Sequence, residues 1–246
     1  MITALFDSFP SSPDAKGNAR SVIRKYLWRA FLTDRYETAA ATKALQDYRG
    51  LSEVIRGNVE TESVPIFQEA VHPLPSHEEL LRAGWPRTRD VLARGIMAIS
   101  IKAGAIDFAD AEPATPHNLS KREYHHLFPD SLLTQDEGGR LTSTQSSRAL
   151  NCALITWNTN RTISAKEPIA YLQERTDASP LGEDEIQRRL WSHLVPFEAL
   201  NVGGYSDLQD HARANRIQAD YDRFLNARAE AMQLPITTLC NGQEWP

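Results

Sequence analysis

The sequence predicts a predominantly helical α+β fold with a small core that contains β-strands. Apolar residues recur at helical spacing over long stretches of both halves of the chain. Two short runs near the middle, 124–128 and 152–157, are rich in aromatic or β-favouring residues. Between these patterns, after Gly104, the chain looks extended, and Pro113 and Pro116 exclude a continuing helix.

The first half is expected to be mostly helical. An amphipathic helix is predicted over 18–36, with apolar positions on one face and basic residues on much of the other. A second helix is predicted over 38–56. The stretch 57–75 holds three prolines and little periodicity, so we expect a loop or linker there.

The next elements are marked by capping signals. Ser76 followed by Glu79 predicts a capping box for a short helix, and Thr88 can cap another that runs to about Lys102. Residues 105–108 are then expected to be extended.

Two short strands and three helices are predicted for the rest of the chain. The strands, 124–128 and 152–157, are separated by a polar stretch that contains Gly138 and Gly139. Pro168 suits the first turn of a helix through Arg175. Two further helices are predicted over 183–194 and 206–232.

Composition indicates an ordinary soluble chain. The 246 residues are 41% hydrophobic and 24% charged, which excludes a disordered, collagen-like or disulfide-stapled protein. Two cysteines, Cys152 and Cys240, favour a reducing cytoplasm, and Cys152 reads as a small core residue. No apolar run is long enough to span a membrane, and nothing marks the chain for export. The 32 acidic and 27 basic residues give a net charge of -5, which argues against a typical DNA-binding protein.

The densest chemical signal is YHHLFP at 124–129, followed by Asn151, Asn158 and Asn160. Two strands and a helix could bring these residues together. Such a set suits a hard divalent cation held by few protein ligands, beside a neutral imidazole that takes a proton from water. Adjacent histidines on a strand point in opposite directions, so His125 and His126 cannot do the same work from one face unless the backbone kinks.

These residues resemble a known family. HHLFP, a strand beginning at Asn151 and then NTNRTISAKEPIAYL are similar to the HNH, or ββα-metal, nuclease domain of GmrSD-type and SspE-type restriction proteins. The similarity runs from Glu123 to Arg175 and is weak outside it. It implies a helical connector at 1–115, the nuclease core at 116–178 and a C-terminal helical region at 179–246.

The resemblance implies a role for each motif residue. His126 would be the general base, His125 would bind the metal, and Asn160 would complete the metal site from the helix. Asn151 would brace the loop that carries the base. Because the last position is Asn and no cysteine pairs surround the motif, Mg²⁺ or Mn²⁺ is expected in place of zinc.

The implied activity is metal-assisted hydrolysis of a phosphodiester in DNA. A single such site cuts one strand per encounter, so we expect nicking. The resemblance also implies an anti-phage restriction system with an N-terminal nucleotide-hydrolysing sensor, whose D-G-Q-Q-R-type motif is absent from this sequence. That sensor would be a further domain or a partner protein.

Basic residues cluster in sequence around the motif, although a charge run is usually a solvated face. Arg161, beside Asn160, is the best candidate for a phosphate contact, with Lys166, Arg148 and Arg122 as further candidates. Arginines of the later helices could extend this groove or pair with acidic residues at i±4; they are Arg188, Arg189, Arg213, Arg216, Arg223 and Arg228.

Other interpretations stay open. The asparagines could be turn or capping residues, and Glu123, Asp130 and His117 could join the site or lie in solvent. The remaining histidines are expected to be solvated: His72, His77, His193 and His211. The chain could be a non-catalytic nucleic-acid-binding or interaction module, or an RNA nuclease with the same site.

Overall fold

The computed structural model describes residues 2–5, 9–87, 90–134 and 142–245 of the chain. The chain divides into two compact units, one formed by 1–76 with 234–246 and the other by 77–233. The boundaries of these units differ from those of the three regions that the resemblance implies, which are 1–115, 116–178 and 179–246. None of the helices in the described residues is both long enough and apolar enough to cross a membrane.

The first unit is helical. Its helices in the described residues are α1 (Ile2–Leu5), α2 (Pro13–Leu32), α3 (Ala40–Ile55) and the end of α12 (Asp210–Cys240). Ser12 caps α2 by accepting a hydrogen bond from the backbone of Ala15, and Pro13 occupies the first helical position. The predicted helices over 18–36 and 38–56 are therefore confirmed, with the first ending in a 3₁₀ turn at Asp34–Tyr36.

The stretch 57–75 does not behave as a linker. It forms two 3₁₀ turns, Thr61–Ser63 and Pro65–Phe67, and Val64, Ile66 and Phe67 are buried in the core of the first unit. Of the two alternatives expected, the segment is an ordered loop and not a linker, because three of its apolar side chains fill the core of the first unit.

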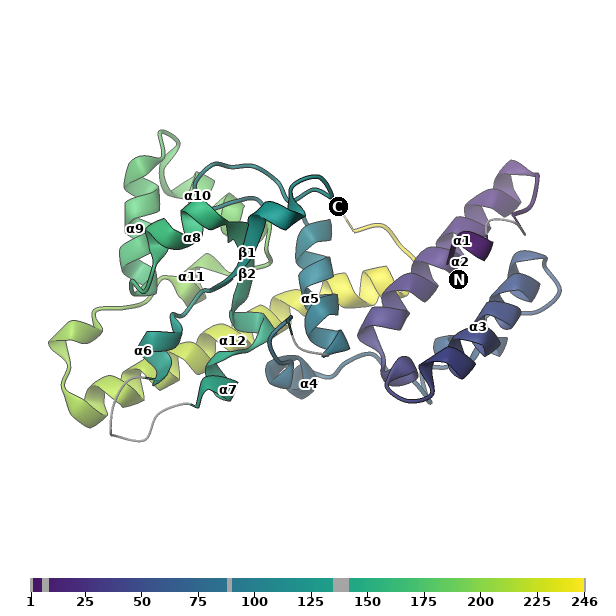
Figure 1. Cartoon of the computed structure of the whole chain (residues 1–246), viewed down its shortest axis with the longest axis horizontal. Helices are drawn as coiled ribbons and strands as arrows, with labels where there is room; N and C mark the ends of the chain where they lie inside the picture. The colour runs from purple at the N-terminus through teal and green to yellow at the C-terminus, as the bar shows by residue number, and fades with distance from the viewer. Residues whose placement is uncertain (1, 6–8, 88–89, 135–141, 246) are drawn as a thin grey trace. The chain divides into compact units, whose positions relative to one another are not determined.

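The second unit holds a two-stranded antiparallel sheet among helices (Figure 1). Strand β1 (Arg122–His126) pairs with β2 (Cys152–Thr156), so that His126 lies opposite Cys152 and Arg122 opposite Thr156. Helix α8 (Trp157–Ile163) begins directly after β2. A mostly helical α+β fold was predicted and is confirmed. The second strand lies where it was predicted, and the first begins and ends two residues before the predicted 124–128.

The other helices of the second unit come before, between and after the two strands along the chain. They are α4 (His77–Arg82), α5 (Val91–Lys102), α6 (Asp130–Thr134), α7 (Ser143–Ser146), α9 (Pro168–Ala178), α10 (Gly182–Trp191), α11 (Phe197–Leu200) and α12 as far as Gln233. Helix α5 is capped by Asp90, whose side chain accepts a hydrogen bond from the backbone of Ala93. The predicted cap Thr88, like Gly138 and Gly139, lies outside the described residues.

One predicted element is missing from the second unit. Residues 105–108 were expected to be extended, but they form an irregular loop without strand pairing. The loop is fixed by its own polar contacts, in which Asp107 accepts hydrogen bonds from the backbone of Ala109 and Asp110. The short run 105–108 is mostly buried but is not a strand, because an apolar run of this length indicates burial without fixing the secondary structure.

Candidate functional site

The pleat of β1 separates the two adjacent histidines. His125 is 3% exposed, and its ring nitrogen Nδ1 meets the side chain of Asn160 on α8. His126 is half-buried and stacks on the indole of Trp85, with the ring centroids 4.0 Å apart and the planes at 15°. The two rings contact different elements, as expected for neighbours on a strand.

Three polar side chains converge beside α8. Asn160 Oδ1 accepts a hydrogen bond from His125 Nδ1 at 2.7 Å, and Asn160 Nδ2 donates to Glu123 Oε2 at 2.7 Å. Glu123 and His125 share one face of β1 because they are two residues apart. Since Nδ1 carries the proton, Nε2 of His125 has the lone pair, and this buried atom has no hydrogen-bond partner among the described residues.

Both imidazoles are neutral at pH 7. Burial lowers the pKa of His125 to about 4, although the hydrogen bond to Asn160 opposes this shift. Burial also lowers the pKa of His126, and the nearby carboxylate of Asp130 partly offsets the effect. A neutral ring is the form that can accept a proton or bind a metal ion.

Aromatic and acidic side chains surround His126. Trp85 also packs edge-on against Tyr124, which shares the His126 face of β1, with the ring centroids 6.3 Å apart. Asp130 begins α6 and accepts a hydrogen bond from the Ser146 hydroxyl. His126 Nε2 is buried and has no hydrogen-bond partner among the described residues. The Asp130 carboxylate acts electrostatically on His126 by raising the pKa of its ring. Whether Asp130 joins the site was left open by the sequence.

Asn151 holds the loop that follows His126. Its Oδ1 accepts a hydrogen bond from the Phe128 N–H at 2.8 Å, and its Nδ2 donates to the Phe128 carbonyl at 3.0 Å. Its Nδ2 also donates to the carbonyl of Ser146, and its own carbonyl accepts from the Leu127 N–H. Asn151 is fully buried. The hydrogen bonds expected of a bracing asparagine are thus present.

Asp107 positions the start of α8 and was not singled out from the sequence. Its carboxylate accepts hydrogen bonds from the Thr156 N–H at 2.6 Å and the Thr159 hydroxyl at 2.5 Å. Burial tends to raise the pKa of Asp107, but these bonds and those from Ala109 and Asp110 lower it overall. No local sequence pattern indicates this role, because Asp107 lies 49 residues before Thr156 along the chain.

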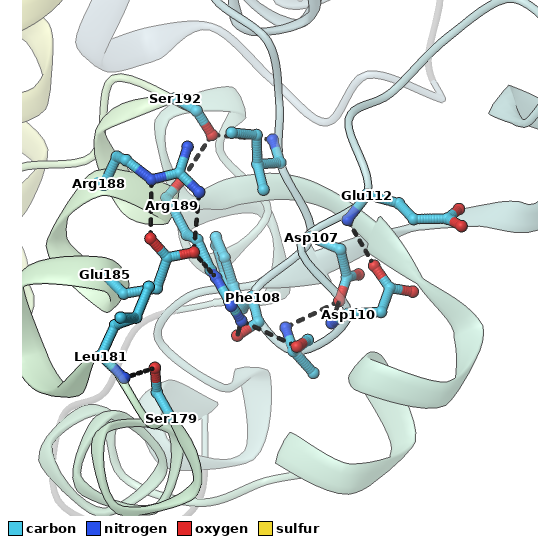
Figure 2. Close-up of polar contacts among 12 residues, drawn as sticks. Asp107, Phe108, Asp110, Glu112, Ser179, Leu181, Glu185, Arg188, Arg189 and Ser192 are labelled. Carbon is cyan, nitrogen blue, oxygen red and sulfur yellow. Dashed lines mark hydrogen bonds and ion pairs between the residues drawn. The ribbon is translucent and has the colours of Figure 1, made fainter.

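Helix α10 fixes the loop that carries Asp107 (Figure 2). Arg189 donates hydrogen bonds to the carbonyls of Phe108 at 3.1 Å and Ala109 at 2.8 Å. Glu185 holds Arg189 through a hydrogen bond of 2.8 Å and also binds Arg188. A connected set of polar contacts therefore extends from α10 through the loop to α8, the helix that carries Asn160.

The four candidate phosphate contacts have different environments. Arg161 is exposed, with its guanidinium carbon 4.1 Å from the centroid of the Trp157 ring. Lys166 forms an ion pair with Glu174, and Arg148 donates to the carbonyl of Arg82.

Arg122 is the fourth candidate, and it is buried. Its guanidinium donates to the carbonyls of Glu112, Ala105 and Leu154. Because these carbonyls occupy its N–H groups, Arg122 is a structural residue here and contacts no phosphate in this conformation.

The arginines of the later helices mostly pair with acids at i±3 or i±4. Glu185 binds Arg188 and Arg189, and Asp220 binds Arg216 and Arg223. Arg228 is fully buried and donates to three backbone carbonyls, which excludes it from any surface groove in this conformation.

Two histidines that were expected to be exposed to solvent are buried. His193 is fully buried and donates from Nε2 to the carbonyl of Ile106, and burial lowers its pKa to about 3. His72 is buried against Asp34. Both predictions were wrong because isolated polar residues give no sign of tertiary burial. His117 is exposed, and Cys152 is buried as predicted.

The donor set beside α8 can be tested against a divalent cation. The described residues contain no group of three or more His, Cys, Asp or Glu side chains placed to hold a metal. His125 Nδ1 and Asn160 Oδ1 lie 2.7 Å apart, close to the separation of about 3 Å between neighbouring ligands of an octahedral Mg²⁺. Both atoms could bind the cation only with the ring proton on Nε2, so the metal would replace their present hydrogen bond. Glu123 adds a carboxylate next to Asn160. The set therefore fits a hard cation that keeps most of its waters.

The chain is similar to an uncharacterized protein of Methanocaldococcus jannaschii. The two are 24% identical over 228 residues, which is 88% of this chain and 37% of that relative. The chain thus spans little more than a third of the length of the relative it matches. No family profile matches the sequence, and no solved structure matches it.

Proposed function

We propose that this chain is a metal-dependent DNA endonuclease of the HNH type that nicks one strand. The observation that carries the proposal is the convergence of His125 and Asn160. These residues come from a strand and from the helix after the next strand, and their side chains meet at 2.7 Å. An imidazole and an amide oxygen on a strand–strand–helix unit form the donor pair that the motif resemblance implies.

The environment of the two histidines supports separate roles. His125 lies on the Asn160 side of β1. With its ring proton moved from Nδ1 to Nε2, it would hold Mg²⁺ or Mn²⁺ together with Asn160. His126 lies on the other face and stays neutral at pH 7. When bound, the cation would supply positive charge to phosphate oxygens as negative charge develops on them.

In this proposal His126 is the general base. Its Nε2 has no partner among the described residues but is buried, so it would accept the proton of the attacking water only once the side chains around it admit that water. The Trp85 ring covers one face of the imidazole and fixes its plane. Asn151 holds the loop after His126 in place, so that the base keeps one position relative to β1.

Phosphate binding is assigned to the exposed basic groups near α8. Arg161 is on the same helix as Asn160, and no carboxylate of the described residues pairs with it. Lys166 follows α8 and would have to exchange its pairing with Glu174 for a phosphate. Arg148 is half-buried and has a lesser part in this proposal.

The wider role in this proposal is that of a cytoplasmic effector in an anti-phage restriction system. The resemblance places a nucleotide-hydrolysing sensor N-terminal to such nuclease regions, and that sensor would be a further domain or a partner. The net charge of -5 agrees with a nuclease that binds arbitrary DNA weakly until it is delivered.

The activity is tested on supercoiled plasmid incubated with Mg²⁺ or Mn²⁺. The wild-type chain should produce open-circular DNA, and EDTA should abolish the product. His126→Ala should lose at least about a hundredfold in rate, because a general base contributes roughly that much or more. Asn160→Ala should also lose activity.

His211→Ala is the matched control, since His211 is an exposed histidine on α12 and outside the site. It should nick like the wild type. A chain that produces no open-circular DNA with either metal contradicts the nuclease. A His126→Ala variant that nicks at the wild-type rate contradicts the assigned base, and cleavage of RNA alone favours the RNA nuclease.

A further inference from the structure

Helix α8 carries an exposed aromatic side chain beside the candidate metal ligand. Trp157 begins the helix directly after β2 and is 47% exposed. Trp157, Asn160 and Arg161 stand at positions i, i+3 and i+4, which lie next to one another on a helix surface. Trp157 was expected at the end of a strand, whereas it is the first residue of α8.

Arg161 covers the ring of Trp157. The guanidinium carbon lies 4.1 Å from the ring centroid, which is cation–π distance. Arg122 and Arg228 are buried against carbonyls, and Arg189 holds the Asp107 loop. Arg87 is also exposed, with its guanidinium carbon 5.7 Å from the centroid of the Tyr124 ring on β1. Arg161 therefore combines an exposed charge with an aromatic partner, and no carboxylate in the described part of the chain neutralises it.

We propose that Trp157 and Arg161 form a platform for one unpaired nucleobase and its phosphate, next to the cleaved position. This inference rests on the proposed nuclease function and names its substrate class as DNA with a single-stranded segment. Base-on-aromatic stacking tolerates any base, and the arginine supplies the charge for the adjoining phosphate.

The charge of the chain favours stacking as the source of affinity. With 32 acidic and 27 basic residues, the molecule attracts duplex phosphates weakly overall. Three of the four candidate phosphate contacts also have partners, Arg122 and Arg148 in backbone carbonyls and Lys166 in Glu174. An aromatic surface contributes affinity without a broad basic field, and an unpaired strand is the form of DNA that offers base faces to it.

The test measures binding without cleavage. The full-length chain is titrated, with EDTA present, into a fluorescein-labelled 20-nucleotide oligo-dT and into a labelled hairpin duplex, and fluorescence anisotropy gives each Kd. The single strand should bind more tightly than the duplex. Trp157→Ala should weaken binding of the single strand by about tenfold, and Trp157→Phe should stay within about threefold of the wild type.

Trp191→Ala is the matched control. Trp191 lies on α10 and is 54% exposed, so replacing it removes an indole as accessible as that of Trp157 but on another helix. It should leave both Kd values unchanged, and circular dichroism should be the same for all variants. The platform is contradicted if Trp157→Ala binds oligo-dT as the wild type does, if Trp191→Ala weakens binding equally, or if the duplex binds at least as tightly as the single strand.

The two proposals fail separately. If the wild type nicks plasmid and Trp157→Ala leaves oligo-dT binding unchanged, the nuclease proposal stands and the platform is contradicted. A chain that binds oligo-dT through Trp157 but cuts no DNA keeps the platform and loses the nuclease.

Discussion

Asn151 and Phe128 exchange two hydrogen bonds, one in each direction, across 23 residues of sequence. The Asn151 side chain thereby pairs both backbone groups of Phe128, two residues after His126. Leu127 lies between His126 and Phe128. Its carbonyl accepts a hydrogen bond from the Tyr171 hydroxyl at 2.9 Å, and its N–H donates to the Asn151 carbonyl. The exit of β1 is consequently fixed on both sides, and with it the position of His126.

Replacing Asn151 by Ala should destabilise the chain. The change leaves the buried N–H and carbonyl of Phe128 without partners, which costs about 1–3 kcal/mol for each group. We expect the free energy of unfolding in urea to fall by roughly 3 kcal/mol and plasmid nicking to fall with it. Asn158→Ala, an exposed asparagine on α8, is the control and should change stability by less than about 0.5 kcal/mol. Equal urea midpoints for the two variants would contradict the bracing role.

Local patterns were enough to predict the two strands of the site and a helix after them. Aromatic and β-branched residues mark both strands, but the strand was expected to run through Trp157, which is the first residue of α8, capped by Thr156. The alternation of a strand also predicts that His125 and His126 contact different surroundings. The order of strand, strand and helix could therefore be anticipated, together with the residues that each contributes.

The parts that were missed depend on distant contacts. Asp107 reaches Thr159 across 52 residues, and Arg228 reaches Leu150 across 78. In the sequence, Arg122 looks like any basic residue near the motif, and its burial follows only from how the 104–114 loop folds over it. Whether a charged side chain faces solvent or backbone carbonyls is decided by tertiary packing, which one sequence without an alignment does not report.

Replacing Asp107 by Asn should disturb the position of α8. The carboxylate accepts four hydrogen bonds, and an amide would present donors to the Thr156 N–H or the Ala109 N–H. We expect a loss of about 2–4 kcal/mol in the free energy of unfolding. If α8 loses its position, nicking should fall further than at Asp110→Asn, since Asp110 accepts only an exposed backbone bond from Glu112. Similar nicking by both variants would show that α8 does not depend on Asp107.

Arg228→Met should be among the most destabilising single changes in the second unit. Arg228 donates to the carbonyls of Leu150, Cys152 and His193 at 2.7–2.9 Å, and burial lowers its pKa to about 10, so it stays protonated at pH 7. Methionine fills similar space but leaves the buried carbonyls of Leu150 and Cys152 without this donor and the His193 carbonyl with only the 3.4 Å bond from Ser100, at a cost of about 3–5 kcal/mol. Arg188→Met, at a half-exposed arginine, should cost less than about 1 kcal/mol. Urea denaturation of both variants checks the difference.

His193 should make the chain less stable in acid. Its pKa is about 3 in the folded chain because the ring is buried, whereas an unfolded histidine titrates near 6.5. Between these values the unfolded chain binds one more proton at this residue. The free energy of unfolding therefore decreases as the pH falls below about 6.5, by about 1.4 kcal/mol per pH unit from this group. His193→Gln can still donate to the Ile106 carbonyl but cannot take up the proton.

The stability difference between wild type and His193→Gln should accordingly shrink by about 2 kcal/mol from pH 6.5 to pH 5. Urea denaturation at half-unit steps of pH measures it. His125, with a folded pKa of about 4, acts with the same sign and is unchanged in both chains, so it cancels from the comparison. A difference that stays constant over this range would mean that folded His193 takes up a proton as readily as the unfolded residue does, and would contradict its burial as a neutral ring.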